Sequence, residues 1–134
     1  MDRAGVENLL REHKLKVTKT RVEVMMLLKN THLHPSAEMI MAKLQEQGMS
    51  LSFASVYNIL ETFYKNGLIG RMKDENNVMR FDANTNFHIH LVDENTHEIT
   101  DYFDEDLTNI FKKKVKKLRD ENIDAKSVTV LINV

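Results

Sequence analysis

The chain has 134 residues, of which 42% are hydrophobic and 29% charged, with a formal net charge of −1, so it is too apolar for a disordered protein and too short for a large multidomain enzyme. It contains no cysteine, which excludes a disulfide scaffold, an iron–sulfur cluster and thiol catalysis, and leaves His, Asp and Glu as the ligands of any metal. No apolar run approaches the roughly 18 residues of a membrane-spanning helix, and the N-terminal residues lack a signal-peptide pattern, so we expect a cytoplasmic protein with no membrane partner.

Charge is distributed unevenly along the chain. Residues 1–82 carry a net charge of +2 and residues 83–134 a net charge of −3. The basic excess is concentrated in residues 11–21, which contain five Lys and Arg residues and a single Glu. This segment is either a surface that faces DNA phosphates or an ordinary solvated helical surface.

The first half of the chain shows four amphipathic segments with a helical period. The second is predicted to begin after Thr18 as its N-cap, and the fourth after Ser52. The third is predicted to open at His34 and Pro35, with Pro35 in the first helical position, and to stop at Gly48. The apolar positions of the four segments, in order, are Val6, Leu9 and Leu10; Val22, Met25, Met26 and Leu28; Ala37, Ile40, Met41 and Leu44; and Val56, Ile59, Leu60 and Phe63.

The period changes from about 3.6 to about 2 after Gly67. Residues 68–73 and 78–82 are predicted strands, and the polar residues 74–77 form the turn between them. Helices followed by a two-stranded wing are typical of a winged helix-turn-helix, in which the fourth helix enters the major groove of DNA.

The second half follows a short linker, residues 83–87. Strands are predicted over residues 88–92 and 98–102, a helix from Asp104 to about Asn122, and a β-branched final strand over residues 127–134. In the helix, Leu107, Ile110, Phe111, Val115 and Leu118 are spaced as a core stripe. The lysines of the segment Lys112–Lys117 are therefore interpreted as a solvated face rather than as a nucleic-acid patch.

Two histidines at the start of the second half have the spacing of a metal clip. On a strand, His88 and His90 project from one face about 6.6 Å apart, which a metal with bonds of roughly 2.1 Å bridges once the rings converge. Asp101 faces this pair if residues 93–96 form a hairpin turn, and Asp82 lies at the end of the wing. Such a set suits Fe(II), Mn(II) or Zn(II). The alternative is a pair of ordinary structural histidines.

Seven short motifs follow one another along nearly the whole chain: Thr18–Arg21, His34–Glu38, Ser52–Tyr57, Gly67–Ile69, Arg80–Asp82, His88–His90 and Ile99–Asp101. Their order resembles the ferric uptake regulator (Fur) superfamily of metal-dependent repressors. The resemblance implies an α+β fold, with an N-terminal winged helix-turn-helix in residues 1–82, a hinge in residues 83–87 and a small α/β dimerisation and metal-sensing domain in residues 88–134.

The resemblance also implies a regulatory metal between the two domains. It adds His34 as a ligand, so that the full set becomes His34, Asp82, His88, His90 and Asp101. Members that control iron uptake tend to have Glu at the position of Asp101, whereas the peroxide-responsive PerR branch tends to have Asp. In that branch, Fe(II) reacts with hydrogen peroxide and a ligand histidine is oxidised, which implies His34 and His88 as the oxidised residues.

Three departures from the family pattern are visible, the first being that no histidine follows His97, so the auxiliary metal site of some members is not predicted. Many members hold a structural zinc with two pairs of cysteines, which this chain cannot do, so the homodimer depends on strand and helix packing. PerR-like recognition helices often carry an arginine one turn after the tyrosine, where this chain has Glu61. Glutamate can accept a hydrogen bond from cytosine N4, so operator preference is not transferred from the relatives.

The sequence thus predicts a cytoplasmic, homodimeric repressor and not an enzyme. Lys16 and Arg21 are expected to contact the DNA backbone, and Ser55, Tyr57 and Asn58 to face the bases of a double-stranded operator. Fe(II) or Mn(II) is the expected metal, with Zn(II) a further option. The alternatives are an iron or zinc uptake regulator without oxidation chemistry, a metal-free winged-helix module and, more remotely, a non-haem iron enzyme.

Overall fold

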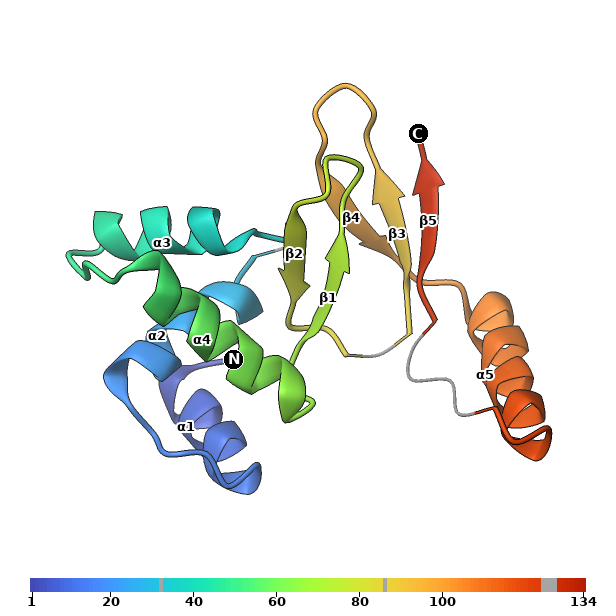
Figure 1. Cartoon of the computed structure of the whole chain (residues 1–134), viewed down its shortest axis with the longest axis horizontal. Coiled ribbons are helices and arrows are strands. Elements are labelled where there is room, and N and C mark those ends of the chain that lie inside the picture. The colour runs from blue at the N-terminus through green and yellow to red at the C-terminus, as the bar shows by residue number, and fades with distance from the viewer. Residues whose placement is uncertain (32, 86, 124–127) are drawn as a thin grey trace. The chain divides into compact units, whose positions relative to one another are not determined.

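A computed structural model describes residues 1–31, 33–85, 87–123 and 128–134. The chain divides into two compact units, Met1–Thr85 and Asn86–Val134. The first contains four helices and a two-stranded sheet, and the second contains a three-stranded sheet and one helix (Figure 1). The expected α+β class, a winged helix followed by a small α/β domain, is confirmed. Among the described residues, no helix combines the length and apolar character needed to cross a membrane.

Each helix of the first unit begins at a short polar residue whose side chain accepts a hydrogen bond from a backbone N–H of the first turn. Such a cap satisfies a donor that has no partner within the helix. Thr18 and Ser52 take the cap positions that the sequence predicts. The helices and their caps are α1 (Arg3–Glu12, Asp2), α2 (Lys19–Lys29, Thr18), α3 (Ala37–Glu46, Ser36) and α4 (Phe53–Lys65, Ser52).

The predicted start of the third helix is wrong by two residues. Ser36 is the N-cap of α3, and its Oγ accepts from the Met39 N–H at 3.2 Å, so Pro35 lies outside the helix. The Pro35 carbonyl instead accepts from the Phe81 N–H at 2.9 Å, and Ser36 forms an antiparallel bridge with Arg80. Residues 35–36 therefore run in extended form beside the wing, which the helical period could not reveal.

The core of the first unit is formed by the apolar faces of its four helices and by the wing. Most positions chosen from the helical period are buried, and Phe81 of the wing closes the core with 1% exposure. Burial on this scale is the main favourable contribution to folding. The buried helical side chains are Val6, Leu10, Val22, Val24, Met25, Leu28, Ala37, Ile40, Leu44, Val56, Leu60 and Phe63.

The wing consists of β1 (Gly70–Lys73) and β2 (Met79–Asp82), which pair in antiparallel fashion with Gly70 opposite Asp82. The first strand starts two residues later than predicted: the Leu68 N–H donates to the Phe63 carbonyl at 2.9 Å at the end of α4, and the pairing with β2 begins at Gly70. Asp74 organises the turn: its Oδ1 accepts from the N–H groups of Asn76 at 2.9 Å and Val78 at 3.0 Å.

The second unit contains a sheet in the order β4–β3–β5. Strands β3 (Ile89–Val92) and β4 (Ile99–Tyr102) form the predicted hairpin, and β5 (Val130–Asn133) pairs with β3 in parallel at an edge of the sheet. The final strand was predicted from residue 127, which lies outside the described residues, as does residue 86 of the predicted hinge. The long connection before β5 includes α5 (Glu105–Asp120).

The prediction that α5 carries a core stripe is wrong for the single chain. None of its residues is buried, and Ile110 is 57% exposed. Phe111 contacts Phe87, with ring centroids 5.2 Å apart. The five lysines of the segment Lys112–Lys117 are exposed, as a solvated face requires. The second unit thus leaves apolar surface uncovered, including Tyr102, Phe103, Ile110, Leu131, Ile132 and Val134.

The wing turn gives a stability prediction with a defined pH dependence. Burial raises the pKa of Asp74, but hydrogen bonds from the Val78 N–H, the Arg80 guanidinium and the Asn76 N–H outweigh burial and hold the pKa below its ordinary 3.8. A carboxylate with a lowered folded-state pKa stabilises the protein fully above its unfolded pKa, and this contribution is lost as the pH falls through the folded value.

We therefore expect Asp74→Asn to lower the free energy of unfolding by about 1–3 kcal/mol at pH 7. The difference between wild type and variant should begin to shrink as the pH falls below 3.8, where Asp74 of the unfolded chain becomes protonated, and should be smallest below the lower pKa of the folded protein. Urea unfolding at several pH values measures it. A difference that stays constant down to pH 2 would contradict the role of the charge.

Candidate metal centre and DNA-facing surface

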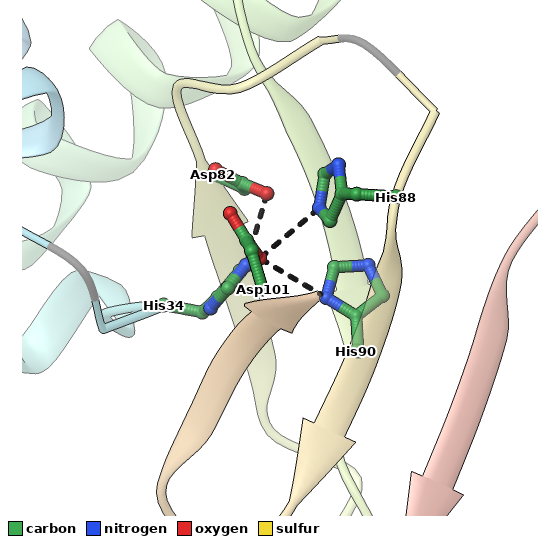
Figure 2. A group of neighbouring side chains, drawn as sticks. All are labelled: His34, Asp82, His88, His90 and Asp101. Atoms are coloured by element: carbon green, nitrogen blue, oxygen red, sulfur yellow. Dashed lines mark hydrogen bonds and ion pairs between the residues drawn. The ribbon is translucent and has the colours of Figure 1, made fainter. Parts of the chain in front are cut away.

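Three predicted metal ligands meet on one face of the β3–β4 hairpin. The register places His90 directly opposite Asp101, and His88, two residues before His90, projects from the same side. Asp101 Oδ1 lies 3.2 Å from His88 Nε2 and 3.8 Å from His90 Nδ1, and the two imidazole centroids are 4.5 Å apart (Figure 2). All three residues come from within 14 positions of the chain, so local folding of one hairpin is enough to assemble them.

The hairpin is held in register by its turn and by its buried neighbours. Asp93 Oδ1 accepts from the N–H groups of Asn95 at 2.8 Å and Thr96 at 2.9 Å, and the hydrogen bonds from Thr96 and Asn95 lower the pKa of this carboxyl. Ile89 and Ile99 are each 1% exposed. Because a slip of one residue would move every side chain to the other face, this register fixes which residues face His90.

The geometry of this group fits a metal ion. One ligand atom from each of His88, His90 and Asp101 lies within 4.8 Å of the other two. Bonds of about 2.0–2.2 Å place neighbouring ligand atoms of one ion roughly 3–4 Å apart, so small side-chain rotations suffice to coordinate it. Two imidazoles and a carboxylate favour Fe(II), Mn(II) or Zn(II) over metals that select thiolates.

The first unit holds the other two predicted ligands against each other. His34 is 2% exposed, and its Nε2 lies 2.9 Å from Asp82 Oδ2 (Figure 2). Asp82 is the last residue of β2, and its Oδ1 accepts from the Asn84 N–H at 2.8 Å. His34 precedes α3 in the extended segment beside β2. The pair is therefore positioned by the packing of the winged helix alone.

The predicted base-facing residues of α4 differ in their environment. Ser55 and Asn58 are exposed. Tyr57, in contrast, is half-buried and packs at the edge of the core. Its ring stacks on Phe53, with centroids 6.0 Å apart, and meets Phe81 edge-on at 6.5 Å. The phenol is thus held rigidly at the boundary between core and helix surface.

The two residues predicted to contact the DNA backbone lie near the start of α2. Lys16 is exposed, and Arg21 donates from Nη1 to the Lys16 carbonyl at 2.9 Å. Arg21 therefore fixes the segment that leads into α2 and presents Lys16 beside it. This contact gives Arg21 a structural role that the charge pattern alone did not reveal.

Glu61 has a partner within the protein. Its carboxylate forms an ion pair with Arg71 of β1, and the Arg71 guanidinium carbon lies 3.9 Å from the centroid of the Tyr64 ring. The pairing raises the pKa of Arg71 although burial opposes it. Glu61 thus ties the wing to α4, and acceptance of a hydrogen bond from cytosine N4 by Glu61 would compete with this pair.

Two residues of interest were missed in the sequence. Phe53 is 47% exposed in the first turn of α4, and its position next to the Ser52 cap could have indicated an exposed aromatic side chain. Arg80 lies two residues before Asp82 on β2, so the alternation of side chains along a strand places both on one face. This alternation could be read from the sequence, whereas the hydrogen-bond partners of Arg80 could not.

Comparison with known proteins defines the class. Residues 12–132 match the ferric uptake regulator family, and the chain therefore belongs to that family. It is 31% identical to the peroxide-responsive repressor PerR of Staphylococcus epidermidis over 93 residues, which are 69% of this chain and 62% of that repressor. The alignment therefore spans less than two thirds of the length of this curated relative.

Solved structures agree with the fold. The ferric uptake regulator of Pseudomonas aeruginosa, solved with manganese, superposes with a TM-score of 0.73 at 27% identity and covers 96% of each chain. PerR from Streptococcus pyogenes superposes with a TM-score of 0.55 at 26% identity, over 98% of this chain and 88% of the other.

The hairpin gives a direct prediction for metal binding. His90→Ala and Asp101→Ala should each weaken Mn(II) binding by at least about tenfold, the loss caused even by removing a group that only supports a metal ligand. Titration calorimetry of the full chain measures the affinity. Glu94→Ala, which removes an exposed carboxylate from the turn of the same hairpin, is the control and should leave it unchanged. Full Mn(II) affinity in both ligand variants would exclude this site.

Proposed function

We propose that this protein is a metal-dependent, DNA-binding transcriptional repressor that responds to hydrogen peroxide through a regulatory Fe(II) or Mn(II). The observation that carries the proposal is the presence of two incomplete ligand groups, one in each unit. The hairpin offers His88, His90 and Asp101, and the winged helix offers His34 and Asp82. Each group is held by the packing of its own unit.

In this proposal one metal ion binds all five residues. Asp82 and His88 are six positions apart, and an extended chain spans at most about 3.3–3.6 Å per residue, so connectivity limits their separation to roughly 20 Å. A hinge of this length keeps the two groups within reach of a common ion. Fe(II), Mn(II) and Zn(II) accept such a mixed set, and the relative from P. aeruginosa was solved with manganese.

Metal binding would then control the arrangement of the units. A ligand shifts a conformational equilibrium only by its difference in affinity for the two states. The hairpin residues are close together whatever the arrangement of the units, so His34 and Asp82 are the ligands that make the ion sensitive to that arrangement. The metal therefore favours the arrangement in which α4 of each subunit fits the major groove.

DNA recognition in the proposal divides between two surfaces. Ser55, Tyr57 and Asn58 of α4 face the bases, and Lys16 and Arg21 contact phosphates at the start of α2. The rigid packing of Tyr57 between Phe53 and Phe81 supports a role in readout, because little conformational entropy is lost on binding.

Peroxide sensing is supported by Asp101 and by the similarity to PerR of S. epidermidis. Because the chain has no cysteine, reversible thiol chemistry is excluded as the sensor. Fe(II) held by His34, Asp82, His88, His90 and Asp101 would supply one-electron reduction of hydrogen peroxide to hydroxide and a hydroxyl radical, the oxidant for a nearby side chain. The oxidised groups in this proposal are the imidazoles of His34 and His88, and the loss of these ligands weakens metal binding and releases DNA.

A second candidate is a regulator of metal uptake that uses the same ligands without oxidation. The similarity to the ferric uptake regulator of P. aeruginosa, at 27% identity over 96% of each chain, supports it. Both candidates share metal-dependent DNA binding and differ only in the response to peroxide. Membership of a regulator family argues against the non-haem iron enzyme considered from the ligand set.

The deciding experiment is anaerobic DNA binding with Fe(II), Mn(II) or no metal, with and without hydrogen peroxide, on duplexes selected from a random library. We expect binding with either metal, none without metal, and loss after peroxide only in the Fe(II) form. Mass spectrometry should then find one added oxygen on the peptide that contains His34 or His88. Oxygen found only on methionines, or equal loss in the Mn(II) form, would favour the uptake regulator.

The two DNA-facing surfaces should respond differently to mutation. Lys16→Ala should weaken binding to all sequences alike and reduce the slope of log affinity against log salt by about 1, because one phosphate contact is lost. Asn58→Ala should change the selected sequence and cost about 1–3 kcal/mol on the wild-type sequence. Fluorescence anisotropy on selected and scrambled duplexes distinguishes them. A change of sequence preference in Lys16→Ala would contradict the assignment.

The uncovered apolar surface of the second unit supports a homodimer. Edge strands and exposed apolar side chains of this kind are buried in a partner. We expect light scattering to give a dimer at micromolar concentration, and Ile110→Asp to shift it toward monomer without loss of the winged-helix fold. A wild-type chain that is monomeric at this concentration would overturn the dimer.

A further inference from the structure

Two side chains of β2 hold His34 at two different points. Arg80 and Asp82 are two residues apart, so they share one face of the strand, while Phe81 between them points into the core. Arg80 Nη1 donates to the His34 carbonyl at 2.8 Å, and Asp82 Oδ2 lies 2.9 Å from His34 Nε2. The backbone of His34 and its imidazole are thus fixed by the same strand.

Arg80 is itself held by the wing turn. Its Nε donates to Asp74 Oδ2 at 3.0 Å, and the side chains of Arg80 and Asp74 are only 15% and 10% exposed. The other carboxylate oxygen of Asp74 accepts from Asn76 and Val78 in the turn. Hydrogen bonds to charged, largely buried groups are stronger than those between neutral groups. A continuous chain of such bonds therefore runs from the wing turn through Asp74 and Arg80 to His34.

We propose that Arg80 is a positioning residue for His34 as a metal ligand and that Asp74 acts through Arg80, so that the order of the wing turn sets part of the metal affinity. This inference rests on the proposed function, because it assumes that His34 binds the metal. Its physical basis is preorganisation: a ligand whose backbone is already fixed loses less conformational entropy when the metal binds. Groups that orient metal ligands contribute to affinity without touching the metal.

The contact can be removed without unfolding the segment. The Phe81 N–H still donates to the Pro35 carbonyl at 2.9 Å, and Ser36 still bridges to Arg80 through the backbone. Residues 35–36 therefore remain beside β2 when the Arg80 guanidinium is lost. Arg80→Met keeps much of the side-chain volume and removes the hydrogen bonds together with the positive charge that pairs with Asp74.

The test is a double-mutant cycle on the full chain with Mn(II) affinity as the readout, measured by titration calorimetry. We expect Arg80→Met to weaken Mn(II) binding by about 10–100-fold, and Asp74→Asn to weaken it in the same direction but less. In a His34→Ala background, Arg80→Met should have no further effect, since its influence passes through His34. Arg80→Lys restores a charge but not the fork that spans Asp74 and the His34 carbonyl, and should recover only part of the affinity.

Arg71→Met is the matched control. It removes the other wing guanidinium, which pairs with Glu61 of α4, and should leave Mn(II) affinity within about twofold, in line with the additivity of independent sites. A second readout needs no metal. In the metal-free protein, Arg80→Met should change the nitrogen resonances of the His34 ring, whereas Arg71→Met should not.

Three outcomes separate the possibilities. An equal loss of affinity from Arg80→Met in the wild-type and His34→Ala backgrounds means a general structural role and overturns the inference. Unchanged Mn(II) affinity in Arg80→Met overturns it as well, and if that variant fails to fold, Asp74→Asn takes its place in the cycle. A wild-type chain that does not bind Mn(II), Fe(II) or Zn(II) overturns the proposed function together with this inference.

Discussion

The alternation of side chains along β2 is the constraint on which the arrangement of the winged helix depends. Phe81 points inward, closes the core and supports the ring of Tyr57, while its neighbours Arg80 and Asp82 project from the opposite face toward His34. Because side chains alternate with a period of two along a strand, the directions of these three side chains are fixed together by the backbone of β2. Packing of the core, support of α4 and orientation of His34 therefore depend on one short strand.

The second unit uses the same property of strands in a different way. His88 and His90 share a face of β3, and the antiparallel register adds Asp101 from β4. The asparagine and threonine N–H groups that bind Asp93 shape the turn and hold that register. The face is a local product of one hairpin, whereas the pair His34 and Asp82 joins residues 48 positions apart and depends on the whole winged helix.

Sequence periodicity predicts the helices, the wing and the hairpin because each is governed by local spacing. It places Val56, Leu60 and Phe63 in the core, and it places His88, His90 and Asp101 on one face. It fails at Pro35, because the pairing of residues 35–36 with the wing is a tertiary contact that overrides a good helical start. It also fails for α5. The spacing of apolar residues on a helix is the same whether that face packs against its own chain or against another. The partners of Glu61 and Arg80 were inaccessible for a similar reason: an ion pair across elements leaves no periodic signal.

The shortness of the segment between Asp82 and His88 has a consequence for how tightly an ion is held. For two groups joined by a tether, the strength of their joint binding is set by an effective concentration, which falls with roughly the −3/2 power of tether length once the tether is long enough. In the regulator proposed above, a longer connection here would keep every proposed ligand and give a response only at higher metal levels. The length of residues 83–87 would thus tune the metal threshold of that proposed sensor independently of the residues proposed to bind the metal.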